Sequence, residues 1–335
     1  LLNGSIPVED ALKDDGLGPR EKGHLRLVDQ VKAFGENELG LKRTQNYQTV
    51  NLKSHQSPIY TISASPKDRL TRKTWWFPIV GDMPYLGFFD LDKARAEKSR
   101  LEKDGLDVTI GAADAYSTLG WFKDPLTLNL IKGDTVDLVE IILHEMTHAT
   151  LYLKGEGAFN ESLAVLVGKM GAHQFLRDTY GPLHPLTTEA WNSIEDELVF
   201  SSFFNALIEE LECLYNTSID YQGKLIQREK VFANALQDFN YLTESFRTQR
   251  YAGFGGAGLN NAYLLSISLY HRHFHLFKAV LRRNEGSIPE TLDFFRKLAK
   301  EKGSIMERLR KWADEWSVNL ARSNEMCLRP RRVNG

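Results

Sequence analysis

The chain has 335 residues, of which 42% are hydrophobic, 11% aromatic and 26% charged, and its formal net charge is −2. This composition is typical of a folded globular protein, and a chain of this length can bury enough apolar surface to be stable without disulfides or a structural metal. The near-zero charge gives no electrostatic basis for a nucleic-acid partner. No apolar run approaches the ~20 residues of a membrane-spanning helix, so the sequence predicts no transmembrane segment.

Cysteine usage and the first residues leave the cellular compartment open. The two cysteines, Cys213 and Cys327, are compatible with one disulfide or with two free thiols. The chain begins LLNGSIPVEDAL, without an initiator methionine or a basic, apolar leader. Either a signal has been processed or the N-terminus has been trimmed, and the sequence is compatible with both.

The N-terminal part is predicted to contain helices and a small twisted sheet. Residues 20–39 show helical periodicity that ends near Gly40, and the charged segment LDKARAEKSRLEKDG predicts a second helix ending at Gly105. Short segments rich in β-branched and aromatic residues, bounded by Gly, Pro or Asp, indicate strands. They are IYTISA (59–64), TWWFPIV (74–80), GLDVTIGA (105–112) and DAYSTLGWF (114–122).

From Asp134 onward the chain is predicted to be almost entirely helical. Asp134 or Thr135 caps a helix that runs to about Lys154, KGEG forms the following turn, and a second helix begins near Asn160. Because no linker-like stretch interrupts the chain, we expect one domain over 1–335, of the α+β class and predominantly helical, with residues 20–134 before the helical part at 135–322. The further helical patterns cover 186–215, 218–247, 258–284, 288–301 and 303–322.

The stretch HEMTHATLYLKGEGAFNESLA, residues 144–164, contains the residue types of a catalytic metal site. His144 and His148 are four apart on a predicted helix, so both imidazoles project from one face and can bind one zinc ion at ~2.0–2.1 Å. Glu145 then lies beside the metal, where its carboxylate can take a proton from zinc-bound water and pass it to a leaving amine. This is the H-E-x-x-H arrangement of zinc peptidases.

A catalytic zinc needs a third protein ligand and an open fourth position. Glu161, in the first turn of the returning helix, is our preferred third ligand. Glu156 is the competitor, but it lies in a Gly-flanked turn, which holds a side chain less firmly. A chance H-E-x-x-H arises in roughly one chain in a hundred of this length. However, the aliphatic setting VEIILHEMTHATLYL would rarely place His, Glu and His together without a function for them.

HEMTH followed by FNESLA resembles the gluzincin branch of zinc peptidases, in which a glutamate on the next helix is the third ligand. Three further segments, at 75–90, 105–125 and 259–270, resemble a bacterial family of predicted aminopeptidases, and the similarity covers roughly residues 20–300. The resemblance implies a gluzincin-like fold, one Zn²⁺ per chain, a peptide substrate and aminopeptidase activity. It implies His144, His148 and Glu161 as zinc ligands and Glu145 as general base and acid.

The chain departs from the resemblance at one position of the second helix. Relatives often have an acidic residue where this chain has Gly168. If that acid orients a zinc-binding histidine, another group must do so here. Glu140, one turn before His144, is a candidate, and a solvated surface charge is the alternative for it.

Substrate-binding groups are predicted less sharply than the ligands. The oxyanion that forms in peptide hydrolysis needs a donor, for which Tyr270 is the first candidate and Tyr116 the second. An edge strand in TIGAADAYSTLG can pair with extended substrate backbone. The acid that would bind a free α-ammonium group is not singled out among Glu156, Asp114 and others.

Three other sequence patterns resemble binding or modification sites but are weak evidence for them. GFGGAG at 253–258 fits G-x-G-x-x-G, but its helical flanks favour a flexible turn between helices over a dinucleotide site. His271 and His275 have the zinc-pair spacing without a glutamate beside them, so a histidine-rich helix face is preferred over a second metal site. Sequons at 160 and 216 are expected to be unused for lack of the glycosylation machinery, and a glycan on Asn160 would also obstruct Glu161.

We therefore expect a zinc metallopeptidase, with an aminopeptidase as the preferred activity. The alternatives are an endopeptidase with the same chemistry and a non-catalytic helical protein with a structural zinc site. The resemblance further suggests a bacterial protein exported to the periplasm or cell envelope, with a possible lipid tether on the precursor.

Overall fold

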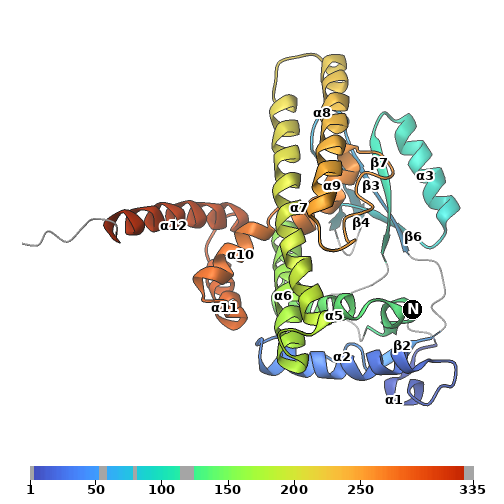
Figure 1. Cartoon of the computed structure of the whole chain (residues 1–335). Coiled ribbons are helices and arrows are strands. Elements are labelled where there is room, and N and C mark those ends of the chain that lie inside the picture. The colour runs from blue at the N-terminus through green and yellow to red at the C-terminus, as the bar shows by residue number, and fades with distance from the viewer. Residues whose placement is uncertain (1–3, 53–58, 78–80, 114–123, 328–335) are drawn as a thin grey trace, which may run out of the picture.

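A computed structural model of the chain describes residues 4–52, 59–77, 81–113 and 124–327. It confirms the predicted α+β class, with short strands in the N-terminal part and a helical body after them (Figure 1). The helices are α1 (Val8–Ala11), α2 (Pro19–Asn37), α3 (Leu91–Lys103), α4 (Leu128–Lys132), α5 (Thr135–Thr150), α6 (Gly157–Tyr180), α7 (Pro185–Tyr215), α8 (Tyr221–Leu242), α9 (Asn261–His271), α10 (Phe274–Arg283), α11 (Ile288–Leu298) and α12 (Ile305–Cys327). The strands are β1 (Ile6–Pro7), β2 (Thr49–Asn51), β3 (Ile59–Ser65), β4 (Trp75–Phe77), β5 (Gly81–Met83), β6 (Leu86–Phe88), β7 (Asp107–Ala113) and β8 (Leu126–Thr127).

The described strands form three small sheets. In one, β3 lies between β6 and β7 and is antiparallel to both, with the β7 register running from Ile59↔Ala113 to Ser65↔Asp107. In the second, β2 is antiparallel to β1 and parallel to β8, and in the third, β4 pairs with β5. The predicted strands at 59–64, 74–80 and 105–112 correspond to β3, β4 and β7, and the one predicted at 114–122 lies outside the described residues.

A buried ion pair joins the β6–β3–β7 sheet to the helical body. Asp107, at the start of β7, accepts hydrogen bonds from the Arg228 guanidinium of α8 at 2.7 and 3.2 Å. The backbone N–H of Asn261, the first residue of α9, donates to the same carboxylate at 3.0 Å. Both side chains of the ion pair are buried, so α8 and α9 are fixed against this sheet.

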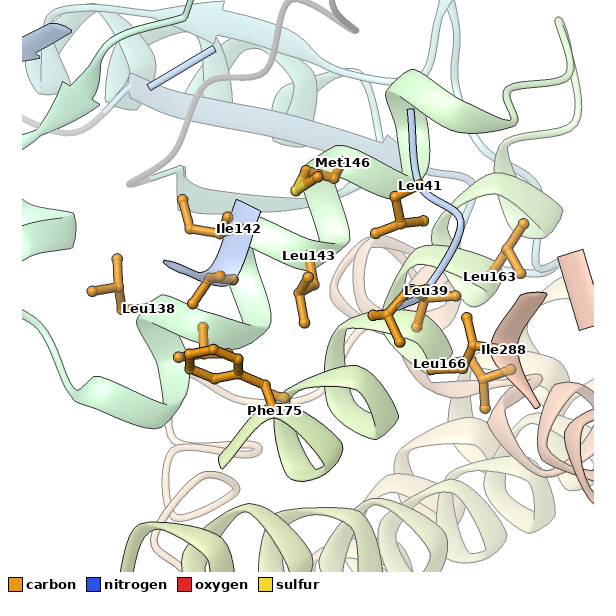
Figure 2. Close-up of a cluster of buried hydrophobic side chains, with 14 of the residues drawn as sticks. Leu39, Leu41, Leu138, Ile142, Leu143, Met146, Leu163, Leu166, Phe175 and Ile288 are labelled. Atoms are coloured by element: carbon orange, nitrogen blue, oxygen red, sulfur yellow. The ribbon is translucent and has the colours of Figure 1, made fainter. Parts of the chain in front are cut away.

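Helices α5 and α6 pack against each other in the main hydrophobic core (Figure 2). Leu143 of α5 and Leu163 and Leu166 of α6 are fully buried there. Gly168 allows the close approach, because a Cβ at this position would lie 2.9 Å from the Glu140 carbonyl oxygen and 3.4 Å from the His144 Cβ. The two helices that contain the predicted ligands are thus held at short range.

Several helix ends differ from the prediction. Helix α5 ends at Thr150 rather than near Lys154, because Leu151 has an extended backbone. Helix α6 begins at Gly157, and the helix predicted over 258–284 is divided at Arg272 into α9 and α10, since His273 leaves helical geometry. None of the described helices has both the length and the apolar character needed to cross a bilayer.

Candidate metal centre

Helix α5 presents both histidines on one face. The Asp134 carboxylate caps the helix by accepting from the N–H groups of Val136 and Asp137 at 2.7 and 3.3 Å, as one of the two predicted caps. His144 and His148 follow in the second half of the helix, with their Nε2 atoms 3.1 Å apart. Their rings meet edge to face, with centroids 4.7 Å apart, so the two Nε2 atoms converge on one point beside the helix.

The turn between α5 and α6 is held by one asparagine. Gly155 adopts a positive φ of 83°, which explains the first glycine of KGEG. Asn160, 1% exposed, accepts from the Leu153 N–H at 2.9 Å and donates to the Leu153 carbonyl at 2.8 Å. These two bonds bring the start of α6 back along the end of α5 and place Glu161 opposite the histidines. The buried, doubly bonded amide also fits an unused sequon at 160.

The three predicted ligand atoms lie close together. Glu161 Oε2 is 3.3 Å from His144 Nε2 and 3.6 Å from His148 Nε2, which completes a triangle with the 3.1 Å between the imidazoles. A tetrahedral ion with bonds of ~2.0–2.1 Å has neighbouring ligand atoms about 3.3–3.4 Å apart. The three distances bracket that value. Within the described residues, this is the one group of three or more such side chains compact enough to hold a metal ion.

The charges within the group stabilise the ionised form of Glu161 opposite the two imidazoles. Burial alone would raise the pKa of Glu161, but hydrogen bonds and charge from His144 and His148 lower it to about 2. For His148, burial opposes protonation, while the Glu161 carboxylate and the charge of Glu145 raise the pKa above its usual range. The carboxylate is therefore ionised at neutral pH, as a metal ligand must be.

Glu145 lies next to the group without belonging to it. Its Oε2 atom is buried and has no hydrogen-bond partner within the described residues, as is also true of His148 Nδ1. A buried polar atom without a partner is costly and calls for an explanation such as catalysis or an ion. An unengaged carboxylate oxygen beside a metal-binding group is available to accept a proton.

Tyr47 is a neighbour of Glu145 that the sequence did not reveal. It is 5% exposed, and burial together with the charges of Glu145 and Asp124 raises its pKa. Its φ of 66° is unusual for a non-glycine residue, and such backbone strain is concentrated at functional sites. No periodicity connects this loop residue to the α5 motif, so sequence alone gave no signal for it.

Two tyrosines, Tyr270 and Tyr152, are neighbours of the group. Tyr270, at the end of α9, is 39% exposed, and burial, then the charge of Glu161, with Tyr85 and Glu145 after it, raises the pKa of its phenol. The Tyr152 ring contacts the His148 ring edge to face, with centroids 6.4 Å apart. Its position four residues after His148 was the available sequence signal. The second oxyanion candidate, Tyr116, lies outside the described residues.

Glu140 does not orient a zinc-binding histidine, so that prediction is wrong. Its Oε1 accepts from Ser193 at 2.9 Å and its Oε2 from Arg250 at 2.9 Å, with the Lys169 ammonium 3.7 Å away. The side chain is buried, so the solvated alternative is wrong as well. The close contact of Gly168 with this part of α5 leaves no room for an acidic side chain there.

The weaker sequence patterns have structural roles. Residues 253–258 form turns between helices, and the loop preceding them is fixed to α7, where Asp196 accepts from the N–H groups of Arg247 and Thr248. His271 Nδ1 bonds Glu197 at 2.9 Å and His275 Nδ1 lies 3.3 Å from the Asn205 amide, so the two histidines face different partners. Among possible binders of an α-ammonium group, Glu156 forms the N-terminal cap position of α6, whereas Asp114 lies outside the described residues.

Comparison with known proteins gives one match. A family model described as "Putative aminopeptidase" matches residues 1–310 of the chain. No curated protein and no solved structure matches it.

Proposed function

The chain belongs to the family described as putative aminopeptidases, and on that premise we propose that it is a zinc-dependent peptidase of gluzincin type that removes residues from the N-terminus of peptides. One observation carries the proposal. Three ligand atoms of His144, His148 and Glu161 converge beside a buried Glu145 oxygen that has no partner within the described residues.

The donor set fits zinc better than Mg²⁺ or Ca²⁺. Two imidazoles and one carboxylate are the protein ligands of many catalytic zinc sites, whereas Mg²⁺ and Ca²⁺ prefer oxygen ligands alone. Three protein ligands leave the fourth position of a tetrahedral zinc ion free for water or substrate. Zinc held there would supply a Lewis acid that acidifies water and polarises the substrate carbonyl.

Glu145 performs the proton transfers in this proposal. Its free carboxylate oxygen accepts a proton from the water that attacks the peptide carbonyl carbon. The same oxygen then delivers that proton to the amide nitrogen as the C–N bond breaks, so the amine leaves neutral and the carboxylate is restored. The buried setting keeps bulk water from competing for this oxygen.

Tyr270 is proposed as the oxyanion donor. Because its pKa is raised, the phenol remains protonated at neutral pH and can donate to the negative oxygen that develops on the carbonyl. The charges of Glu161 and Glu145 both act on the phenol, which supports this role for Tyr270.

Substrate backbone is proposed to pair with β7, which is an edge strand of its sheet in the order β6-β3-β7. Extended peptides add to such edges through backbone hydrogen bonds. An aminopeptidase and an endopeptidase differ in their need for a free α-amine. Matched peptides with free and acetylated N-termini should therefore separate the two, with the acetylated peptide left intact by an aminopeptidase.

The proposal is tested by zinc content and hydrolysis measured on the same samples, purified without a histidine tag. Wild type should contain about one zinc per chain, and Glu161→Ala much less. Glu145→Gln should keep its zinc and lose hydrolysis by several orders of magnitude. Glu210→Gln, on the exposed face of α7, is the control and should change neither.

Two results would contradict the proposal in different ways. Full hydrolysis by Glu145→Gln would exclude its role in proton transfer. Bound zinc without hydrolysis of any peptide by the wild type would favour the alternative of a structural zinc site, for which Glu145 has no use.

A further inference from the structure

We propose that Ser162, Ser201 and Glu197 clamp the last turn of α9 and thereby position Tyr270 toward the metal group. We call these three side chains the α9 clamp. The inference rests on the proposed function, because it assigns a positioning task to residues around the proposed oxyanion donor.

The backbone carbonyls on both sides of Tyr270 are engaged from other helices. The last carbonyls of any helix lack an N–H partner within the helix and need one elsewhere. Ser162 Oγ of α6 donates to the Leu269 carbonyl at 3.3 Å, and Ser201 Oγ of α7 donates to the His271 carbonyl at 2.6 Å. Tyr270 is thus the residue between two anchored peptide groups.

The third member of the clamp holds the neighbouring side chain. Glu197 is completely buried, and its Oε1 lies 2.9 Å from His271 Nδ1. Its Oε2 accepts from the Tyr251 hydroxyl at 2.6 Å, and the Lys169 ammonium is 3.8 Å away, so the carboxylate is itself fixed.

These contacts determine where the phenol points. The Tyr270 side chain makes no hydrogen bond within the described part of the chain, so its direction depends on its backbone and on packing, including the contact of its ring with that of His271. Ser162 directly follows Glu161, which means that one turn of α6 holds both a ligand atom and an anchor of α9. A shift of the α9 end by a fraction of an ångström would move the phenol away from the developing oxyanion, where stabilisation depends steeply on geometry.

The neighbouring serines of α7 provide a matched pair of variants. Ser201 Oγ bonds α9, whereas Ser202 Oγ is exposed and bonds Leu198 of its own helix at 3.0 Å. The probe is a phosphinic dipeptide, whose tetrahedral anion mimics the oxyanion, and its affinity for the zinc-loaded protein is measured by calorimetry. Ser201→Ala should weaken binding about tenfold with unchanged zinc content, and Ser202→Ala should not.

A double-mutant cycle with Tyr270→Phe separates positioning from general loosening. If Ser201 acts through the phenol, Ser201→Ala should weaken binding less than about twofold when the hydroxyl is already absent. Glu197→Gln, which keeps the shape of the side chain, should behave in the same way. In the metal-free protein, Ser201→Ala should also speed hydrogen exchange in the last turn of α9, and Ser202→Ala should not.

Equal losses in the presence and absence of the Tyr270 hydroxyl would overturn the clamp, as would equal effects of Ser201→Ala and Ser202→Ala. Tight binding of the phosphinic dipeptide by a wild type that hydrolyses no peptide would overturn the proposed function alone, because the binding cycle does not depend on turnover.

Discussion

His273, between α9 and α10, is a buried histidine in positive surroundings. It is 8% exposed, and burial, followed by the charges of Arg310, Arg272, His275 and Arg72, lowers its pKa to about 3. The folded protein therefore keeps this imidazole neutral at pH values where an unfolded chain protonates it. Between pH 6.5 and about 3 the unfolded state binds the extra proton, so this residue makes the folded state less stable as the pH falls.

We predict that His273→Asn reduces the acid sensitivity of the fold. In wild type, this residue should lower the free energy of unfolding by on the order of a few kcal/mol between pH 7 and pH 4. Urea unfolding at several pH values measures the slope for both proteins, and above pH 6.5 the two slopes should coincide. Identical slopes over the whole range would show that His273 titrates normally.

The proximity of functional residues could be predicted from the sequence where those residues are close together along the chain. His144, His148 and Glu161 lie within one helix–turn–helix, so helical spacing and a glycine turn were sufficient to bring them together. The partners of Glu140, and the neighbourhood of Tyr47, come from distant segments, and no pattern in the sequence encodes those contacts.

Between elements, the spacing of α5 and α6 depends on Gly168. A Cβ there would lie 2.9 Å from a backbone oxygen of α5, which cannot rotate away. Gly168→Ala should therefore push the helices apart, lower the free energy of unfolding by about 1–3 kcal/mol and weaken zinc binding, because His144 and Glu161 are on opposite helices. Chemical unfolding and zinc titration test both effects.

Gly157→Ala is the matched control for this prediction. Gly157 is in the first turn of the same helix, and a Cβ there would meet nothing within 4 Å. Since alanine is the better helix former, the control should be neutral or slightly stabilising. Equal destabilisation by the two variants would mean that close packing at Gly168 is not the cause.

The sequence predicted the presence of helices more accurately than the residues at which they begin and end. Amphipathic periodicity located α2, α3, α7 and α11 to within a few residues. The sequence pattern did not predict the division between α9 and α10. This division depends on tertiary contacts, including those of Ser201 and Glu197 with His271. Similarly, α5 ends at Thr150, and the chain after it is held by the bond from Leu153 to the Asn160 side chain, a contact that has no local signature.

At the scale of the whole molecule, the Asp107–Arg228 pair determines how the β6–β3–β7 sheet sits on the helices. Arg228 also donates to the Lys67 carbonyl at 2.8 Å, so replacing it removes its hydrogen bonds to both Asp107 and Lys67. Arg228→Met should lower the free energy of unfolding by about 3–5 kcal/mol, because it leaves a buried carboxylate without its counter-charge. Urea unfolding followed by circular dichroism measures the change.

The double variant Asp107→Leu/Arg228→Met should recover part of this loss, since replacing both buried charges removes the uncompensated one. Arg95→Ala, which removes an exposed ion pair with Asp92, is the control and should unfold like wild type. A double variant no more stable than Arg228→Met would indicate that the lost hydrogen bonds matter more than the charge.

The short distance along the chain between the three ligand residues has a consequence for folding. His144, His148 and Glu161 are close neighbours in sequence, so bringing them together costs little loop-closure entropy. Tyr270, by contrast, is in α9, and the whole of α7 and α8 lies between it and Glu161 in the sequence. During synthesis, the ligands therefore leave the ribosome well before the tyrosine does. If the proposed function is correct, a growing chain is expected to be able to capture a metal ion before the proposed oxyanion donor has been synthesised.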